Sequence, residues 1–283
     1  MDSRCYNVAM KRRVLWILLV YVIEAAAQET QTSTSRQVRT GWMRIHFAAL
    51  PVPEVKPAWF PYNFDPREES FELFIPPDRP EEPYGVLGWT NPFDAAGAPR
   101  KFEPLLVEHH LIAVSGDRCG NDQGFDRRVG LLTSALLQLE KTLAIDRSRC
   151  ILSGFSGGGR TSATGCFVHP DIWRGAISWA GGNYYKAYSV PMPVGATSPG
   201  INDYYKNGVT SENVKLARRN VRFVLITGSG DFNLNDSRGI YRALRQDGFQ
   251  ALLVEDPGMS HEVGSVQSMK EALEFVLAPK ADH

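Results

Sequence analysis

The stretch Leu152-Ser153-Gly154-Phe155-Ser156-Gly157-Gly158-Gly159-Arg160 contains a G-x-S-x-G box that runs from Gly154 to Gly158, with Ser156 at its centre. A serine on a tight turn between a strand and a helix holds strained backbone angles, and side chains two positions before and after it would collide. Gly154 and Gly158 supply the small residues that such a turn requires. The box therefore predicts a nucleophile elbow if a strand precedes it and a helix follows.

The segments on either side of the box have this order. Arg149 to Ser153 reads as a short buried strand, and Gly159 to Val168 contains few helix breakers before Pro170. A phosphate-binding loop would instead end in a lysine followed by a hydroxyl residue, and this segment lacks that spacing. We therefore favour the nucleophile elbow over a phosphate loop.

Two polar turns follow apolar strand candidates further along the chain. Residues 220–227 lead to Asp231, and residues 251–255 lead to His261. The chain order Ser156, Asp231, His261 is the order of the catalytic triad in α/β-hydrolases. In an α/β sheet the carboxyl ends of the strands lie at one edge, so the three side chains are expected to converge there.

Each of these assignments has an alternative. Ser156 could belong to a structural turn, Asp231 could cap a turn or a helix, and Asp236 is close enough in sequence to replace it. His261 could be a solvated loop histidine, although the other late candidate, His283, is the last residue of the chain. We interpret the histidines that precede the acid as structural, namely His46, His109, His110 and His169.

The chain resembles the α/β-hydrolase superfamily over roughly residues 70–278, through the G-x-S-x-G box and the turns Gly228-x-x-Asp231 and Gly258-x-x-His261. It looks most like the secreted esterases of the polyhydroxybutyrate-depolymerase and feruloyl-esterase group. The resemblance implies an α/β-hydrolase fold, with a mostly parallel central sheet of about eight strands, helices on both faces and no large lid domain.

An oxyanion hole is expected beside the nucleophile. In α/β-hydrolases it consists of the backbone N–H after the nucleophile and one from the loop after the third strand. Here these are Gly157 and either Trp89 or Thr90. Many members of the superfamily have His-Gly at the second position, whereas this chain reads Gly88-Trp89-Thr90.

The rest of the chain alternates between strand and helix patterns. Apolar residues recur every three or four positions in residues 125–144, as on one face of an amphipathic helix. Further strands are predicted at residues 41–47, 70–75, 84–89, 110–114 and 175–179, and further helices at residues 236–246 and 264–277.

Length and composition fit one enzyme domain, which we assign to residues 41–283. The chain has 283 residues, of which 43% are hydrophobic and 22% charged. Its formal net charge is +0, which argues against the basic surface that nucleic-acid binding requires. No Cys/His grouping has the spacing of metal ligands, so we expect no metal and no cofactor.

The N-terminus reads as a secretory signal peptide of residues 1–27. Lys11-Arg12-Arg13 precede the apolar run Val14 to Ile23, and Ala25 and Ala27 fit the small-x-small cleavage pattern. A spanning helix needs about 17 to 25 apolar residues, so we expect no stable membrane span after cleavage. Residues 28–40 form a polar spacer that we expect to be disordered. The protein is therefore expected to be secreted or periplasmic.

The cysteines leave two interpretations open. Cys5 lies in the leader, so Cys119, Cys150 and Cys166 remain, and three cannot all pair with one another. Cys150 and Cys166 are expected near the same edge of the sheet, which makes them the best-placed pair for a disulfide. Three buried thiols are the alternative.

We predict a serine hydrolase that cleaves carboxylic esters. Aromatic residues gather in or beside predicted loops, and Trp179, Tyr184 and Tyr185 are candidates for contacts with an aromatic or polymeric ester, although such rings can also close loops over the core.

A serine peptidase, which would use the same catalytic serine, aspartate and histidine, is an alternative to the esterase. A non-catalytic binding protein on a hydrolase scaffold is a third option, which the Gly88-Trp89 loop favours and the intact Ser, Asp and His oppose. The sequence does not indicate an oligomeric state.

Overall fold

The computed structural model describes residues 39–47, 64, 68–77, 81–185 and 209–279. The chain divides into two units, residues 1–39 and residues 40–283, and the account below concerns the second. The predicted signal peptide and nearly all of the predicted spacer lie outside the described residues.

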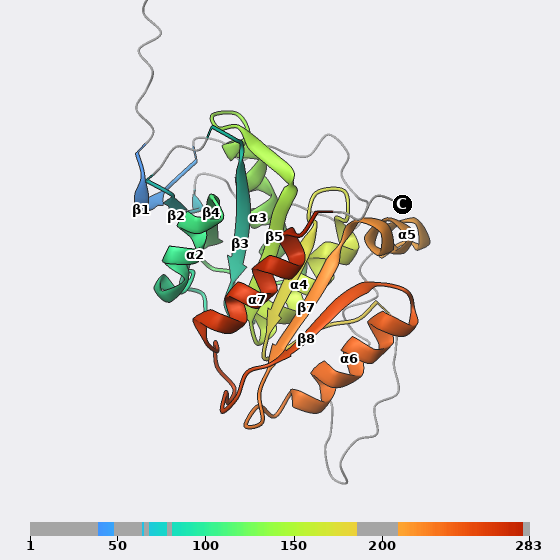
Figure 1. Cartoon of the computed structure of the whole chain (residues 1–283). Coiled ribbons are helices and arrows are strands. Elements are labelled where there is room, and N and C mark those ends of the chain that lie inside the picture. Colours follow the sequence, from blue (N-terminus) through green and yellow to red (C-terminus); the bar gives the residue numbers. More distant parts are fainter. Residues whose placement is uncertain (1–38, 48–63, 65–67, 78–80, 186–208, 280–283) are drawn as a thin grey trace, which may run out of the picture. The chain divides into compact units, whose positions relative to one another are not determined.

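One eight-stranded sheet forms the centre of this unit, in the strand order β1-β2-β4-β3-β5-β6-β7-β8. β1 and β2 are antiparallel to their neighbours, whereas all strands from β4 to β8 are parallel. The strands are β1 (Gly41–Ile45), β2 (Phe71–Ile75), β3 (Tyr84–Thr90), β4 (Leu111–Gly116), β5 (Ile145–Phe155), β6 (Gly175–Trp179), β7 (Arg222–Thr227) and β8 (Gln250–Glu255). This sheet confirms the predicted α/β-hydrolase fold (Figure 1).

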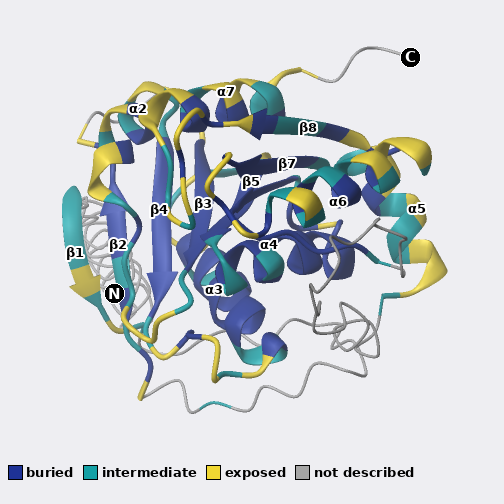
Figure 2. Cartoon of the chain, turned by 90° about the horizontal axis from the view of Figure 1, so that it is seen from below, coloured by how far each residue is buried: buried dark blue, intermediate teal, exposed yellow. Residues whose placement is uncertain are grey.

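Helices cover both faces of the sheet (Figure 2). α2 and α7 pack on one face, whereas α3, α4 and α6 pack on the other and α5 packs against α4. The helices are α2 (Glu103–Glu108), preceded by the 3-10 turn η2 (Arg100–Phe102), α3 (Phe125–Leu139), α4 (Gly157–Val168), α5 (Ser211–Asn220), α6 (Leu234–Gln246) and α7 (Val266–Leu277). Among the described residues, no separate lid domain covers the sheet.

The burial of the strands explains why their sequences are almost continuously apolar. Every residue of β3, β4 and β6 is buried, because helices lie on both sides of them (Figure 2). The strands at the two ends, β1 and β8, keep partly exposed residues. Parallel strands covered on both faces therefore produce the uniform apolar runs from which they were predicted.

Some element boundaries differ from the predictions. β5 begins at Ile145, before the predicted start at Arg149. The prediction missed this part of the strand because it is polar and partly exposed and so has no apolar run. The predicted helix of residues 125–144 ends at Leu139, because the chain turns at residues 140–143. Two helices were not predicted, α2 and α5. Most of α5 faces solvent, with Ala217 its single buried residue, so it has little apolar pattern to detect.

The disulfide between Cys150 and Cys166 is not present. Cys119, Cys150 and Cys166 are all free and buried, which corresponds to the alternative interpretation. The Cys166 thiol donates to the carbonyl of Gly175 at 3.2 Å. Burial raises the pKa of Cys119 and Cys150 to about 12 and also raises the pKa of Cys166. These side chains therefore act as small apolar residues of the core.

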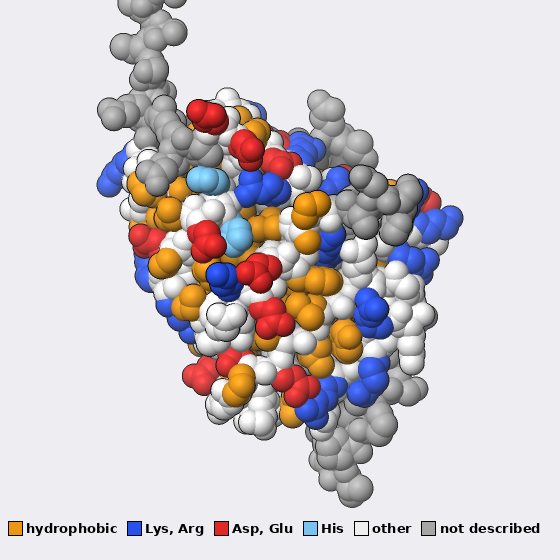
Figure 3. Space-filling model, viewed as in Figure 1, with side chains coloured by type: hydrophobic (Ala, Val, Ile, Leu, Met, Phe, Trp, Pro, Cys, Tyr) orange, Lys and Arg blue, Asp and Glu red, His pale blue; other side chains and the backbone are white. Residues whose placement is uncertain are grey.

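The described surface carries charges of both signs. Figure 3 shows acidic and basic side chains interspersed on the face that α7 covers. Within the described part of the chain, no helix has the length and apolarity to cross a bilayer. The same residues contain no group of three or more His, Cys, Asp and Glu side chains arranged to hold a metal ion.

Candidate active site

Ser156 occupies the sharp turn between β5, which ends at Phe155, and α4, which begins at Gly157. Its backbone has φ 55° and ψ −117°, in a region that residues with side chains rarely adopt. Two hydrogen bonds hold this conformation: the Ser156 N–H donates to Trp179 O at 2.8 Å, and the Arg160 N–H donates to Ser156 O at 3.1 Å. The serine is therefore strained but fixed by the sheet on one side and the helix on the other.

The glycines of the box make room for the last carbonyl of β3. A Cβ atom at Gly154 would lie 2.4 Å from Thr90 O, and one at Gly158 would lie 2.0 Å from the same oxygen. Both distances are far below a van der Waals contact. The elbow therefore approaches β3 so closely that neither position can hold a side chain, as the sequence predicted.

The structure brings Ser156, Asp231 and His261 together. Asp231 lies in the turn after β7 and His261 in the loop after β8. His261 Nε2 lies 2.9 Å from Ser156 Oγ, and His261 Nδ1 lies 2.9 Å from Asp231 Oδ1. Because a carboxylate can only accept, Nδ1 carries the proton and donates to Asp231, which leaves Nε2 to accept from the Ser156 hydroxyl. The three side chains thus form one hydrogen-bonded row.

Asp231 is held from several sides. Its side chain is 0% exposed. Oδ2 accepts from Thr227 Oγ1 at 2.7 Å, and Oδ1 accepts from the backbone N–H of Asn233 at 3.0 Å. The Asn233 side chain in turn donates to Ala180 O at 2.8 Å. These bonds orient the carboxylate toward the imidazole.

The alternative acid, Asp236, lies in the first turn of α6 and has no contact with His261 among the described hydrogen bonds and ion pairs. Burial raises the pKa of the Asp236 carboxyl. The structure therefore selects Asp231 as the partner of His261.

Aromatic rings surround the imidazole. Phe232 stacks on His261 with ring centroids 3.9 Å apart, and Phe155 lies at 5.1 Å. Phe232 is 76% exposed, and Phe93, in the loop after β3, is 68% exposed. Both rings belong to loops at the carboxyl ends of parallel strands, the edge of the sheet that carries Ser156, Asp231 and His261. Phe232 was missed in the sequence, although an apolar residue directly after Asp231 in an otherwise polar turn is a detectable signal.

The three aromatic residues that were predicted to contact the substrate do not line the active site. Trp179 and Tyr184 are both buried in the core, and the Trp179 ring stacks on Phe102 at 5.4 Å. Tyr185 is partly buried, and its hydroxyl bonds to the Asp247 carboxylate. The expectation that these three rings contact the substrate is therefore corrected: they pack around α6 and β6, which is the alternative role of loop aromatics.

The predicted oxyanion donors occupy different environments. Gly157 is the first residue of α4, and the first N–H groups of a helix have no partner within the helix. Trp89 lies inside β3, where it pairs with Ser115 of β4 and Ser153 of β5, so its backbone belongs to the sheet. Thr90 ends β3, and its side chain accepts from Arg128 Nη2 at 3.2 Å.

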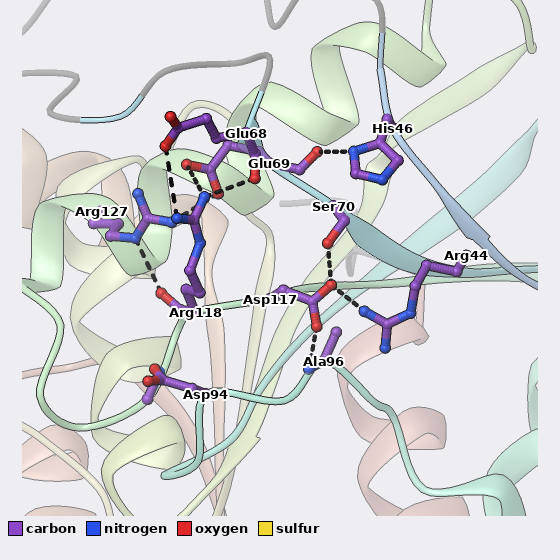
Figure 4. A network of polar contacts seen from close by, with 11 residues as sticks. Arg44, His46, Glu68, Glu69, Ser70, Asp94, Ala96, Asp117, Arg118 and Arg127 are labelled. Carbon is purple, nitrogen blue, oxygen red and sulfur yellow. Dashed lines mark hydrogen bonds and ion pairs between the residues drawn. The ribbon is translucent and has the colours of Figure 1, made fainter.

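The loop after β4 reaches the elbow and is fixed at its base by a network of polar contacts (Figure 4). Glu69, whose side chain is buried, accepts from Arg127 at 2.7 Å and from Arg118 at 3.2 Å. Asp117 accepts from the Ala96 N–H at 3.0 Å and also bonds to Ser70 and Arg44. Arg127 Nε donates to Arg118 O at 3.0 Å. The network ties this loop to β2 and to α3.

Residues 132–278, just over half of the chain, match the prolyl oligopeptidase family. The matched segment begins within α3 and includes the elbow and the loops that carry Asp231 and His261. The chain belongs to the prolyl oligopeptidase family. This membership and the fold together place the protein among the serine hydrolases. No curated protein sequence matches the chain.

Solved structures of other hydrolases have the same fold as this member of the prolyl oligopeptidase family. A ferulic acid esterase is 20% identical, with a TM-score of 0.53 over 74% of this chain and 91% of its own. The S-formylglutathione hydrolase FrmB of Staphylococcus aureus is 10% identical, with a TM-score of 0.55 over 85% and 100%. The fluorophosphonate-binding serine hydrolase F of the same organism is 11% identical, with a TM-score of 0.56 over 86% and 100%.

The contact between the elbow and β3 predicts the effect of adding one methyl group. Gly158→Ala is expected to lower the free energy of unfolding by about 1–3 kcal/mol or more, because the new Cβ meets backbone atoms of Thr90 that cannot move independently of β3. Urea unfolding followed by circular dichroism measures the loss. Gly157→Ala is the matched control, because the atoms nearest to its Cβ belong to the exposed side chain of Asn121 rather than to backbone. Equal stability of the two variants would contradict the prediction.

Proposed function

We propose that the protein is a secreted serine esterase that hydrolyses carboxylic esters through an acyl-enzyme. The observation that supports this most directly is the hydrogen-bonded row of Ser156, His261 and Asp231 at the carboxyl edge of the parallel strands. In this row His261 lies where it can take the hydroxyl proton, and Asp231 holds the imidazole in the tautomer that leaves Nε2 free to accept.

The reaction proceeds in two halves. Ser156 Oγ attacks the ester carbonyl carbon while its proton passes to His261 Nε2, and the carbonyl oxygen becomes an oxyanion. Collapse of the tetrahedral intermediate breaks the bond to the alcohol, which leaves with the proton from His261. Water then attacks the acyl-enzyme with the same imidazole as base, and the carboxylic acid and free Ser156 are released.

The first turn of α4 is suited to the charge that develops. The Gly157 N–H directly follows the nucleophile, and the N-terminus of a helix favours a negative charge through its unpaired N–H groups and its dipole. We assign Gly157 as one oxyanion donor. Of the other two candidates, Thr90 lies at the end of β3, whereas Trp89 is enclosed within the sheet.

The surroundings of His261 favour an ester with an apolar or aromatic group. Phe232, which stacks on His261, and Phe93, in the loop after β3, both have exposed rings. Apart from the contacts within the row itself, no charged side chain bonds to Ser156 or His261 in the described structure. The similar structures named ferulic acid esterase and S-formylglutathione hydrolase support hydrolysis of an ester or thioester.

A serine peptidase is the second candidate, and the family match favours it. It would use the same row of side chains and the same oxyanion hole, but its leaving group would be an amine. The two candidates differ in the bond that is cleaved, which an assay decides.

The protein is expected to turn over short p-nitrophenyl esters, and feruloyl esters or polyester films if the apolar rings accept bulky groups, with little activity on peptides. A fluorophosphonate probe should label Ser156 in the wild type and leave Ser156→Ala unlabelled. Labelling that persists in Ser156→Ala would refute Ser156 as the nucleophile. Cleavage of peptides alone would establish the peptidase.

The choice between the two acids gives a matched pair of variants. Asp231→Asn should lower kcat by about 10⁴-fold, because the amide would impose the wrong tautomer on His261. Asp236→Asn should leave kcat near the wild-type value, because Asp236 makes no described bond to the row. Steady-state kinetics on one p-nitrophenyl ester compares them, and the reverse ranking would show that Asp236 is the acid.

The exposed ring of Phe232 should act mainly through substrate binding. Phe232→Ala is expected to raise KM for aromatic and long-chain esters several-fold while KM for an acetyl ester changes little, because only the larger groups can cover the ring. Phe93→Ala provides the comparison for the other exposed ring, in the loop after β3. If Phe232 serves instead to orient His261, kcat would fall equally for all esters.

We propose that the protein is exported and that its leader is cleaved after Ala27, on the basis of the basic, apolar and small-residue pattern of residues 11–27. Intact-mass measurement of the protein from the extracytoplasmic fraction should give a chain that begins at Gln28. A full-length chain that retains Met1 in that fraction would contradict cleavage.

A further inference from the structure

The side chain of Asn121 lies directly beside the residue that follows the nucleophile. Asn121 belongs to the loop between β4 and α3. A Cβ atom built on Gly157 would lie 1.9 Å from Asn121 Oδ1, 2.7 Å from its Cγ and 3.0 Å from its Nδ2. The carboxamide therefore fills the space that a side chain at position 157 would occupy. It thus lies beside Gly157, the residue whose N–H is assigned as an oxyanion donor.

Arg128 determines which end of the carboxamide is free. Arg128 Nη1 lies 3.5 Å from Asn121 Oδ1 and 3.3 Å from Gly157 O, to which it donates. A guanidinium can only donate, so the carboxamide presents its oxygen to Arg128. Nδ2, a donor, then makes no hydrogen bond to any described residue. Asn121 is exposed, and its NH₂ group is thus available to a ligand.

Arg128 also holds the surrounding loops in place. Although it is charged, it is only 2% exposed. Its Nε donates to Cys119 O at 2.8 Å, in the same loop as Asn121, and its Nη2 donates to Asn91 O at 2.8 Å, just after β3. The Asn121 N–H donates to Pro92 O at 3.0 Å. One buried guanidinium therefore joins the loops after β3 and β4 to the start of α4.

Besides the Thr90 backbone N–H, the loop after β3 has few groups to offer as oxyanion donors. Pro92 has no N–H, and Trp89 is enclosed by two neighbouring strands. The Asn91 side chain turns away from the elbow, because its Oδ1 accepts from Trp89 Nε1 at 2.8 Å and its Nδ2 donates to Gly97 O at 2.9 Å. This is the place where the sequence departs from the His-Gly pattern of the superfamily.

We propose that Asn121 Nδ2 is a side-chain donor of the oxyanion hole, which binds the developing oxyanion together with the Gly157 N–H, and that Arg128 is the positioning residue that aims it. The inference rests on the proposed function, because it requires an acyl-transfer reaction at Ser156. It gives the loop after β4 a part in the oxyanion hole, alongside the Thr90 candidate at the end of β3.

Two substitutions at one position separate a donor from a structural partner. Asn121→Asp keeps an oxygen for Arg128 and nearly the same shape but has no N–H, so the fold is expected to remain intact. If Asn121 donates to the oxyanion, both Asn121→Asp and Asn121→Ala lower kcat about 10²–10³-fold with little change in KM. The aspartate variant should be the slower one, because its charge repels the oxyanion. Asp122→Ala, at the next position of the same loop, is the control and should match the wild type.

Gly157→Ala tests the contact between Asn121 and Gly157 by changing Gly157 instead of Asn121. The new methyl group would displace the Asn121 carboxamide while the backbone N–H of residue 157 is retained. Gly157→Ala alone should therefore lower kcat, whereas the double variant with Asn121→Ala should be close to Asn121→Ala alone. Additive losses would contradict the inference.

A transition-state analogue gives an independent readout. A trifluoromethyl ketone forms an oxyanion on Ser156, and its inhibition constant should rise about 10²-fold or more in Asn121→Ala, in parallel with kcat. Wild-type kcat in Asn121→Asp, or an unchanged inhibition constant in Asn121→Ala, would overturn the inference and leave the esterase proposal standing. A wild-type protein that neither labels with a fluorophosphonate nor cleaves esters would refute the proposed function itself.

Discussion

The close approach between the end of β3 and the turn at Ser156 is the constraint on which the site depends. The Thr90 carbonyl lies so near Gly154 and Gly158 that backbone packs on backbone there. This contact fixes where α4 begins, and it holds Ser156 in a conformation that an isolated peptide would rarely adopt. Asp231 and His261 can meet the serine because β7 and β8 continue the same parallel sheet. The geometry of the side chains is therefore a consequence of strand register.

Most of the strands and helices could be predicted from the sequence because their signals are local. Buried parallel strands produce unbroken apolar runs, and the turn at Ser156 demands glycines at fixed spacing, so both can be recognised without knowledge of distant contacts. The order of the three polar residues added a constraint on topology. The polar start of β5 and the solvent-facing helix α5 lacked these signals, and they were misplaced or missed.

The parts that could not be predicted depend on which residues meet across the fold. A tryptophan at the end of a strand can face a cleft or the core, and only the stacking of Trp179 on Phe102 decides between them. Arg128 interrupts the apolar face of α3, which reads as a solvated charge until the carbonyls around it are known. Asn121 has no local pattern at all, because its significance comes from its distance to Gly157.

The three free thiols bear on the conditions under which the chain can fold. Each is enclosed in the core with a raised pKa, so very little thiolate is present at neutral pH and exchange with disulfides or oxidants is slow. The described structure contains no cross-link whose formation requires an oxidising environment. No oxidant is needed to form this core, so the domain is expected to fold in a reducing cell interior.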